Sequence, residues 1–404
     1  MSGEMTEPAG RQIRILHVFR FFRPKFTGEG IFVERLAPHF AKARPDVIHD
    51  VAVTVTPEPK GGLTVPHLGA IHYLAKTETR GGASQAGIVR WMMRHGRRYD
   101  VVHYHAHADR TFLGAWFLKL IGRRTVQSAT LDDSVEGLLK TYRPLFRPLV
   151  RLLFSAIDRF VAISPKLFAE NNRFVAAEKS VLIPIGIMIP ELSEEGRQAA
   201  RQKFGIAESA TVLVSVGGLC ARKDQMTLIK HMPELVKQHP DLVLLLVGPP
   251  LEPDYCATMQ TFVAEHGLKD HVRFMGYAEA PWDYYKAADM MVFASREEGF
   301  GTVVIEAMAY GLPVVARRLP GVNDAFVDQG TTGHLFDRDE DYAVHVTALL
   351  GDERRRREMG AAGRAFVAKH YDIARVAASY MQVYGFTGQP EQTADTDLYD
   401  RPAK

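Results

Sequence analysis

Short apolar runs rich in β-branched residues recur along the chain, separated by longer segments with helical periodicity. Each run is nearly continuous in apolar residues, as strands buried on both faces of a sheet require. In the first half the runs are 13–18, 50–56, 100–105, 124–129 and 159–163; in the second they are 211–216, 242–247, 272–275, 290–294 and 314–316. This alternation predicts an α/β protein with two parallel sheets covered by helices.

A polar segment over 191–201 separates the two sets of runs and is the best candidate for a linker. It follows one more predicted strand, over 181–184. We therefore expect a doubly wound domain over 1–190 and a second over 191–372. Ligands of such domains bind beyond the carboxyl ends of the strands, and with two domains we expect them in the cleft between the two. The tail over 387–404 is polar and is expected to be disordered.

The composition is that of an ordinary globular protein, since 46% of its 404 residues are hydrophobic and 24% are charged. The two cysteines, Cys220 and Cys256, cannot form a disulfide framework, which is typical of a reducing compartment. The N-terminus carries Glu4 and Glu7 and lacks a signal pattern, and no apolar run is long enough to span a membrane. We expect a cytoplasmic protein.

The two halves differ in charge. Residues 1–190 contain 27 Lys and Arg against 16 Asp and Glu, whereas the remainder contains 23 against 31. A basic first half indicates an anionic partner. Nucleic acid is not expected, because no basic stripe interleaved with stacking aromatics and no known nucleic-acid module is found.

The densest chemical signal follows the run at 290–294. Gly299 and Gly301 predict a turn whose backbone can approach a ligand closely. A helix is expected from Thr302. The free amides of a helix start bind anions. Glu298 precedes the helix and Glu306 lies one turn inside it, and two carboxylates beside an anion site suit the hydroxyls of a sugar nucleotide. The alternative is an ordinary helix with acids near its positive end.

These motifs resemble the signature region of glycosyltransferase family 4. Glu298 and Glu306 are followed by Ala-Met-Ala-x-Gly-x-Pro-Val-Val-Ala, and the remaining similar segments lie at 321–324, 330–333, 214–224, 158–164, 183–186 and 99–105. The similarity runs in order over roughly residues 12–385, so a chance motif is improbable. The resemblance implies the GT-B architecture of two Rossmann-like domains, with a C-terminal helix over 373–386 that returns to the first domain.

The resemblance also implies the chemistry: a retaining transferase that moves a sugar from a nucleoside diphosphate to a hydroxyl of a glycan or lipid-linked glycan. It needs no cofactor, no metal and no protein nucleophile. Glu306 would bind the ribose and Glu298 the donor sugar, while Lys223 would hold the diphosphate. The full set of implied donor-binding residues is Gly28, Gly30, Gly218, Arg222, Lys223, Glu298, Gly299, Phe300, Gly301, Thr302 and Glu306.

Some positions depart from the family pattern. Gly218 stands where the family has an arginine, which leaves Lys223, with Arg222 as the substitute cation, to neutralise phosphate. Ile185 and Met188 stand where the family has an asparagine and an aspartate.

Near the donor sugar we expect a polar role for Asp132 or Asp133, whereas His107 and Asp109 follow the strand at 100–105, where an acceptor could meet them. The candidate catalytic set is Glu298, Lys223, His107 and Asp132. The departures leave open a catalytically silent nucleotide-sugar-binding protein of the same fold.

Two further candidate sites lie in the first half of the chain. The segment from Gly28 to Gly30, ahead of a helix expected near Ile31, resembles the family's glycine loop. A dinucleotide fingerprint would need a third glycine where Val33 stands. A metal site at the alternating residues His103, His105 and His107 would need a further carboxylate or cysteine at ligand spacing, and none is found.

A basic segment near the middle of the chain has two interpretations. Arg143, Arg147 and Arg151 recur every four residues among leucines, with Pro144 and Pro148 disturbing the first turn. A core helix with solvated arginines is the commoner case. The other is an interfacial segment that, with the basic residues at 90–98, contacts anionic lipid or a lipid-linked acceptor at the inner face of the membrane.

Overall fold

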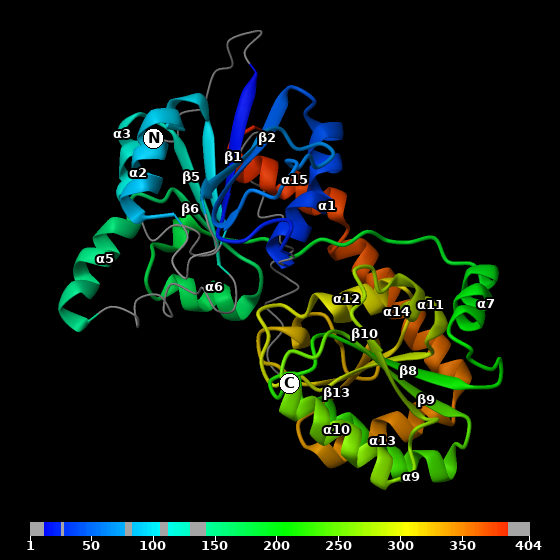
Figure 1. The fold of residues 1–404 in the computed structure, drawn as a ribbon. Coiled ribbons are helices and arrows are strands. Elements are labelled where there is room, and N and C mark those ends of the chain that lie inside the picture. Colours follow the sequence, from blue (N-terminus) through cyan, green and yellow to red (C-terminus); the bar gives the residue numbers. More distant parts are fainter. Residues whose placement is uncertain (1–11, 26–27, 77–82, 106–111, 130–142, 387–404) are drawn as a thin grey trace. The chain divides into compact units, whose positions relative to one another are not determined.

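The computed structural model describes residues 12–25, 28–76, 83–105, 112–129 and 143–386 (Figure 1). The chain divides into two compact units. The first combines Met1–Gly186 with Ile373–Lys404, and the second is Ile187–Asp372. Each unit is built on one parallel sheet with helices on both faces.

The first sheet has seven strands in the order β3-β2-β1-β4-β5-β6-β7, and every pair is parallel. The strands are β1 (Ile13–Phe19), β2 (Val47–Pro57), β3 (Ile71–Ala75), β4 (Val101–His105), β5 (Arg124–Ala129), β6 (Arg159–Ala162) and β7 (Ser180–Leu182). The order reverses between β1 and β4, as in doubly wound folds.

Helices of the described residues cover both faces of this sheet. Phe40 of α1 and Tyr384 of α15 pack on one face with Val126, while Met92 of α2, Leu118 of α3 and Phe154 of α5 pack on the other. The helical elements are α1 (Gly28–Ala43), α2 (Gln85–His95), η1 (Gly96–Arg98), α3 (Phe112–Leu120), η3 (Pro144–Phe146), α5 (Arg147–Phe154), α6 (Pro165–Asn172), η4 (Ala177–Lys179) and α15 (Ile373–Tyr384). Because α15 packs against α1, the predicted return of a C-terminal helix to the N-terminal sheet is confirmed.

The second sheet has six parallel strands in the order β10-β9-β8-β11-β12-β13. Its reversal point lies between β8 and β11. The strands are β8 (Thr211–Val216), β9 (Leu242–Val247), β10 (Val272–Gly276), β11 (Met290–Phe293), β12 (Val314–Arg317) and β13 (Gly333–Phe336). The prediction of two parallel doubly wound sheets is thereby confirmed.

The helices of the second unit likewise lie on both faces (Figure 1). Leu228 of α8, Met259 of α10 and Val346 of α13 pack on one face, while α12 packs with α14 and α11 packs with α7. The helical elements are α7 (Glu194–Lys203), α8 (Gln225–Lys230), α9 (Met232–Gln238), α10 (Pro253–Glu265), α11 (Trp282–Ala287), α12 (Thr302–Ala309), η5 (Asn323–Ala325), α13 (Asp339–Leu350) and α14 (Glu353–His370).

The linker expected over 191–201 is wrong for most of its length, because α7 begins at Glu194. Ser193 accepts a hydrogen bond from the amide of Gly196 and caps this helix. Arg201 is 4% exposed, and its guanidinium donates to Asp289 at 2.7 Å. Arg201, one of the polar residues that indicate a linker in the sequence, therefore belongs to a largely buried ion pair.

The strands β3 and β13 were not predicted, since each is short and partly polar.

Among the helices of the described residues, none is both long and apolar enough to cross a membrane.

Candidate active site

Two loops meet at the reversal point of the second sheet. One runs from Gly217 to Asp224 after β8, and the other from Ala294 to Gly301 after β11. Because β8 and β11 are parallel neighbours, both loops leave the same edge of the sheet, where doubly wound folds bind ligands. The amide of Arg296 donates to the carbonyl of Arg222 at 2.9 Å and ties the loops together.

An ion pair between Lys223 and Glu298 lies where the loops meet. The Lys223 ammonium donates to Oε1 of Glu298, and both side chains are largely buried, with exposures of 16% and 11%. Arg222 contributes a second cation: its Nη1 lies 3.7 Å from Oε2 of Glu298 and donates to the Glu297 carbonyl at 2.7 Å. The structure thus brings together three of the residues that the sequence assigned to one site.

The helix α12 begins at Thr302 as predicted. Gly301 precedes it with φ of 87°, a left-handed conformation that favours glycine. The helix therefore opens directly after the loop that carries Glu298, so the first amides of α12 are available to an anion.

Glu306 lies one turn inside α12, as the spacing predicted, and is 6% exposed. Tyr285 of α11 donates its hydroxyl to Oε2 of Glu306 at 3.2 Å. Nothing in the sequence indicated Tyr285, because a tyrosine within a short helix carries no signal of this contact.

The surroundings of two assigned donor-binding positions, Phe300 and Gly218, limit what their side chains can contact. Phe300 is 4% exposed, and its ring lies 5.6 Å from that of Phe326 and 5.9 Å from that of Tyr371. The ring of Phe300 is therefore part of the hydrophobic core, so at this position only the backbone is free to contact a ligand. At Gly218 a Cβ would lie 2.4 Å from Cδ1 of Leu251, so Leu251 occupies the space where a larger side chain would start.

The glycines of the first unit are placed differently from the prediction. The helix α1 begins at Gly28 and not near Ile31, so Gly28 and Gly30 form its first turn. Glycine is tolerated there because the first amides of a helix have no partner within it, and Glu29 suits the positive end. The other two candidate catalytic residues, His107 and Asp132, lie outside the described residues.

A cluster of four buried histidines lies on one face of the first sheet. Nδ1 of His17 is 2.9 Å from Nε2 of His105, and Nε2 of His17 is 3.0 Å from Nδ1 of His49. His103 contacts the hydroxyls of Tyr384 at 2.8 Å and Ser128 at 2.7 Å. Burial lowers the pKa of His49 to about 4 and that of His103 to about 3, and it holds the pKa of the other two well below 6.5. All four are therefore neutral near pH 7.

Three of these histidines have metal-ligating nitrogens close together. One nitrogen each from His17, His103 and His105 lies within 4.8 Å of the others. Both ring nitrogens of His17 and of His103 are already hydrogen-bonded, so a metal ion would have to replace these bonds. The cluster therefore acts as a polar core that joins β1, β2, β4 and α15.

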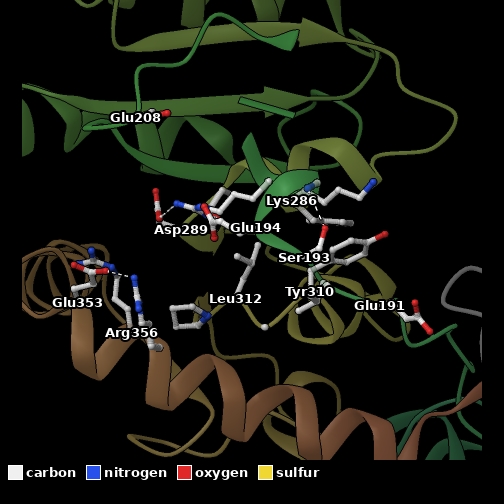
Figure 2. Close-up of a pocket in the computed structure, with 18 residues that line it drawn as sticks. Glu191, Ser193, Glu194, Glu208, Lys286, Asp289, Tyr310, Leu312, Glu353 and Arg356 are labelled. Atoms are coloured by element: carbon white, nitrogen blue, oxygen red, sulfur yellow. Dashed lines mark hydrogen bonds and ion pairs between the residues drawn. The ribbon is translucent and has the colours of Figure 1, made fainter. Parts of the chain in front are cut away.

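A cavity of about 730 Å³ lies elsewhere on the second unit (Figure 2). It is lined by residues that precede strands, such as Asp289 before β11 and Pro313 before β12, so it opens at the amino ends of the sheet. Some of its charged groups pair within the protein, as Arg197 does with Asp289 at 2.7 Å. Neither Lys223, Glu298 nor Glu306 lines it, and the candidate active site lies at the opposite edge.

Doubly wound sheets in two units, with a lysine–glutamate pair at the reversal point of the second, define the GT-B class of glycosyltransferases. Residues 196–366 match the family model of glycosyl transferases group 1. The chain is 30% identical over 335 residues to D-inositol 3-phosphate glycosyltransferase of Segniliparus rotundus, covering 77% of this chain and 73% of that protein. The chain belongs to the glycosyl transferases group 1 family and is a retaining glycosyltransferase.

Other relatives show how widely the family's acceptors vary. The chain is 25% identical over 288 residues to N-acetyl-alpha-D-glucosaminyl L-malate synthase of Bacillus anthracis, covering 70% of this chain and 74% of that one. Its fold is similar to that of Anabaena Alr3699/HepE in complex with UDP and glucose, with a TM-score of 0.71, 19% identity, and 91% and 98% of the two chains covered. Sucrose-phosphate synthase of Thermosynechococcus elongatus gives a TM-score of 0.72 at 23% identity, with 93% and 98% covered.

Proposed function

We propose that this glycosyltransferase moves a hexose-type sugar from a nucleoside-diphosphate donor to a hydroxyl of a glycan or lipid-linked glycan. The observation that carries the proposal is the cluster of Lys223, Arg222 and Glu298 beside the start of α12. A diphosphate needs cations and free amides, and a sugar needs a carboxylate that accepts from its hydroxyls. All of these groups belong to the same two loops.

Each group has its own task in this proposal. The cations of Lys223 and Arg222, with the amides at 299–302, hold the diphosphate. Glu298 accepts hydrogen bonds from hydroxyls of the donor sugar. Glu306, fixed by Tyr285, accepts from the ribose hydroxyls. When the donor enters, Lys223 exchanges part of its contact with Glu298 for a phosphate oxygen.

The charge that develops during transfer explains the placement of the cations. As the bond from the anomeric carbon to the diphosphate oxygen breaks, negative charge grows on the leaving diphosphate. Lys223 and the α12 amides stabilise the diphosphate more strongly in the transition state than in the ground state, because its negative charge is larger in the transition state. This difference is the condition for rate acceleration. The acceptor oxygen attacks on the same face and its proton passes to a diphosphate oxygen, so the sugar keeps its configuration without a protein nucleophile. The expectations of no cofactor and no metal remain part of this proposal.

The acceptor side of the proposal rests on an exposed apolar face in the first unit. Leu145 of η3 and Leu149 and Leu152 of α5 are 83%, 53% and 58% exposed. Their spacing places them on one side of the helix, and Figure 1 shows α5 at the periphery of its unit. On the same helix Phe154 is buried and packs in the core, so the exposed leucines form a separate apolar face. With Arg143 exposed beside them, the face suits peripheral binding to an anionic bilayer that carries a lipid-linked acceptor.

The donor proposal is tested by thermal-shift measurements with UDP-glucose, GDP-mannose and ADP-glucose, followed by donor hydrolysis with the sugar nucleotide that stabilises most. We expect a clear rise in melting temperature with one base, and hydrolysis that falls by about 100-fold or more in Glu298→Gln. Glu297→Gln is the matched control, because this neighbouring carboxylate is exposed. Absence of stabilisation by all three donors, or equal hydrolysis in the two variants, would disprove the proposal.

A further inference from the structure

The residue after Lys223 has an unusual backbone conformation. Asp224 has φ of 50° and ψ of 42°, in the left-handed region that glycine adopts readily and that other residues adopt rarely, Asp and Asn more often than most. Such a conformation persists only where surrounding contacts enforce it. Asp224 is 6% exposed, so those contacts come from the protein.

Three donors converge on one carboxylate oxygen of Asp224. Its Oδ2 accepts from Nε of Arg296, from Nη2 of Arg317 and from Oγ1 of Thr227, each at 2.9 Å. The contact with Asp224 also raises the pKa of Arg296, whose side chain is otherwise mostly exposed. These contacts join the loop after β8 to the loop after β11 and to the end of β12.

The same contacts determine where Lys223 points. Arg296 lies two residues before Glu298, and its amide donates to Arg222, the residue before Lys223. Arg317 also donates from Nε to the carbonyl of Ala294 at 3.0 Å, which fixes the start of the second loop. The two loops are therefore held at their bases by Asp224 while Lys223 and Glu298 meet beyond it.

We propose that Asp224 is a positioning residue that sets the Lys223 ammonium against Glu298 and the donor diphosphate. This inference rests on the proposed function, in which Lys223 stabilises the leaving group. A displacement of Lys223 by about 1 Å lowers the rate of transfer more than it lowers donor affinity, because the charge on the diphosphate is largest in the transition state.

The test compares Asp224→Asn and Arg296→Gln with the native protein, using the donor that gives the largest thermal shift among UDP-glucose, GDP-mannose and ADP-glucose. Asn keeps the shape of the side chain and removes its charge. Arg296 is largely exposed, so its replacement leaves the core intact. We expect kcat for donor hydrolysis to fall by about tenfold or more in Asp224→Asn, with donor KM changed less than about threefold.

A double-mutant cycle with Lys223→Met separates positioning from a general loss of stability. If Asp224 acts through Lys223, Asp224→Asn changes kcat by less than about twofold once Lys223 has been replaced. The matched control is Asp339→Asn, which removes the other carboxylate on Arg317, 2.9 Å from its Nη2, and leaves Asp224 in place. We expect kcat of this control to stay within about twofold of the native value.

Three results would overturn the inference. Equal effects of Asp224→Asn with and without Lys223 would assign it a purely structural role, as would an equal loss of kcat in Asp339→Asn. If Lys223→Met lowers kcat but neither Asp224→Asn nor Arg296→Gln does, the inference fails and the proposed function stands. If Lys223→Met has no effect, the role of Lys223 fails and the inference fails with it.

Discussion

The hydroxyl of Tyr285 donates to Oε2 of Glu306 at 3.2 Å, across the interface of α11 and α12. Both residues are buried, so this hydrogen bond helps to fix the position of the Glu306 carboxylate. It also connects Glu306 to a cluster of aromatic rings that includes Tyr310 and Trp282, with the rings of Tyr285 and Tyr310 5.4 Å apart.

Replacement of Tyr285 by Phe should raise the donor KM by about fivefold with kcat nearly unchanged, because the lost hydrogen bond contributes about 1 kcal/mol to a contact made before and during transfer. Steady-state kinetics of donor hydrolysis measures both constants. Tyr342→Phe is the control, since the buried hydroxyl of Tyr342 has no hydrogen-bond partner among the described residues. A larger loss in kcat than in affinity would contradict a ribose-binding role for Glu306.

Gly301→Ala should weaken both folding and donor binding. A Cβ at Gly301 meets only ordinary contacts, the nearest being Phe326 at 3.7 Å, so the cost of about 1–2 kcal/mol comes from the left-handed backbone. Relaxation of that strain would move the first amides of α12. Calorimetric titration with UDP, GDP and ADP, together with thermal melting, measures both effects.

Gly311→Ala is the matched control for Gly301→Ala. Gly311 also has a positive φ, of 73°, but it precedes β12 at the edge of the sheet away from Lys223. It should lose a similar amount of stability and bind the nucleotide normally. Equal weakening of nucleotide binding in both variants would remove the α12 amides from the donor site.

The stability of the first unit should fall as the pH falls from about 6.5 toward 4. The buried histidines have a lowered pKa, so in this range the unfolded chain takes up protons that the folded chain does not. For each such histidine the free energy of unfolding falls by up to about 1.4 kcal/mol per pH unit over this range. Its stabilising contribution is fully present above about pH 6.5. Urea unfolding followed by tryptophan fluorescence at several pH values measures this slope.

His49→Gln provides the internal comparison for the pH dependence. Its carboxamide does not titrate, so the slope of unfolding free energy against pH should decrease by about one histidine's share, even if the variant is less stable at pH 7.5. An unchanged slope would show that His49 is not held neutral in the folded chain.

Replacement of Leu145, Leu149 and Leu152 together by Gln should abolish flotation with vesicles that contain acidic phospholipids at low salt. The side chains are exposed, so the fold and donor hydrolysis should be unaffected. Val344→Ser, at an exposed apolar position of the second unit, is the control. If the native protein itself does not bind such vesicles, the membrane part of the proposal is wrong.

The sequence by itself determined the class of fold, because strands buried on both faces must be continuously apolar and helices between them must be amphipathic. It also determined the helix start at Thr302 and the position of Glu306 within α12, since both follow from local spacing. It failed at 191–201, where polar side chains indicate a linker but Arg201 is buried against Asp289.

Only the tertiary structure decided which distant residues meet. Lys223 and Glu298 are 75 positions apart and come together because β8 and β11 are adjacent, a pairing that local periodicity does not encode. The contacts of Tyr285 with Glu306 and of Asp224 with Arg296 and Arg317 likewise depend on how separate loops pack. Local sequence specifies the conformation of each segment, whereas the strand order of the sheet specifies which loop ends share one edge.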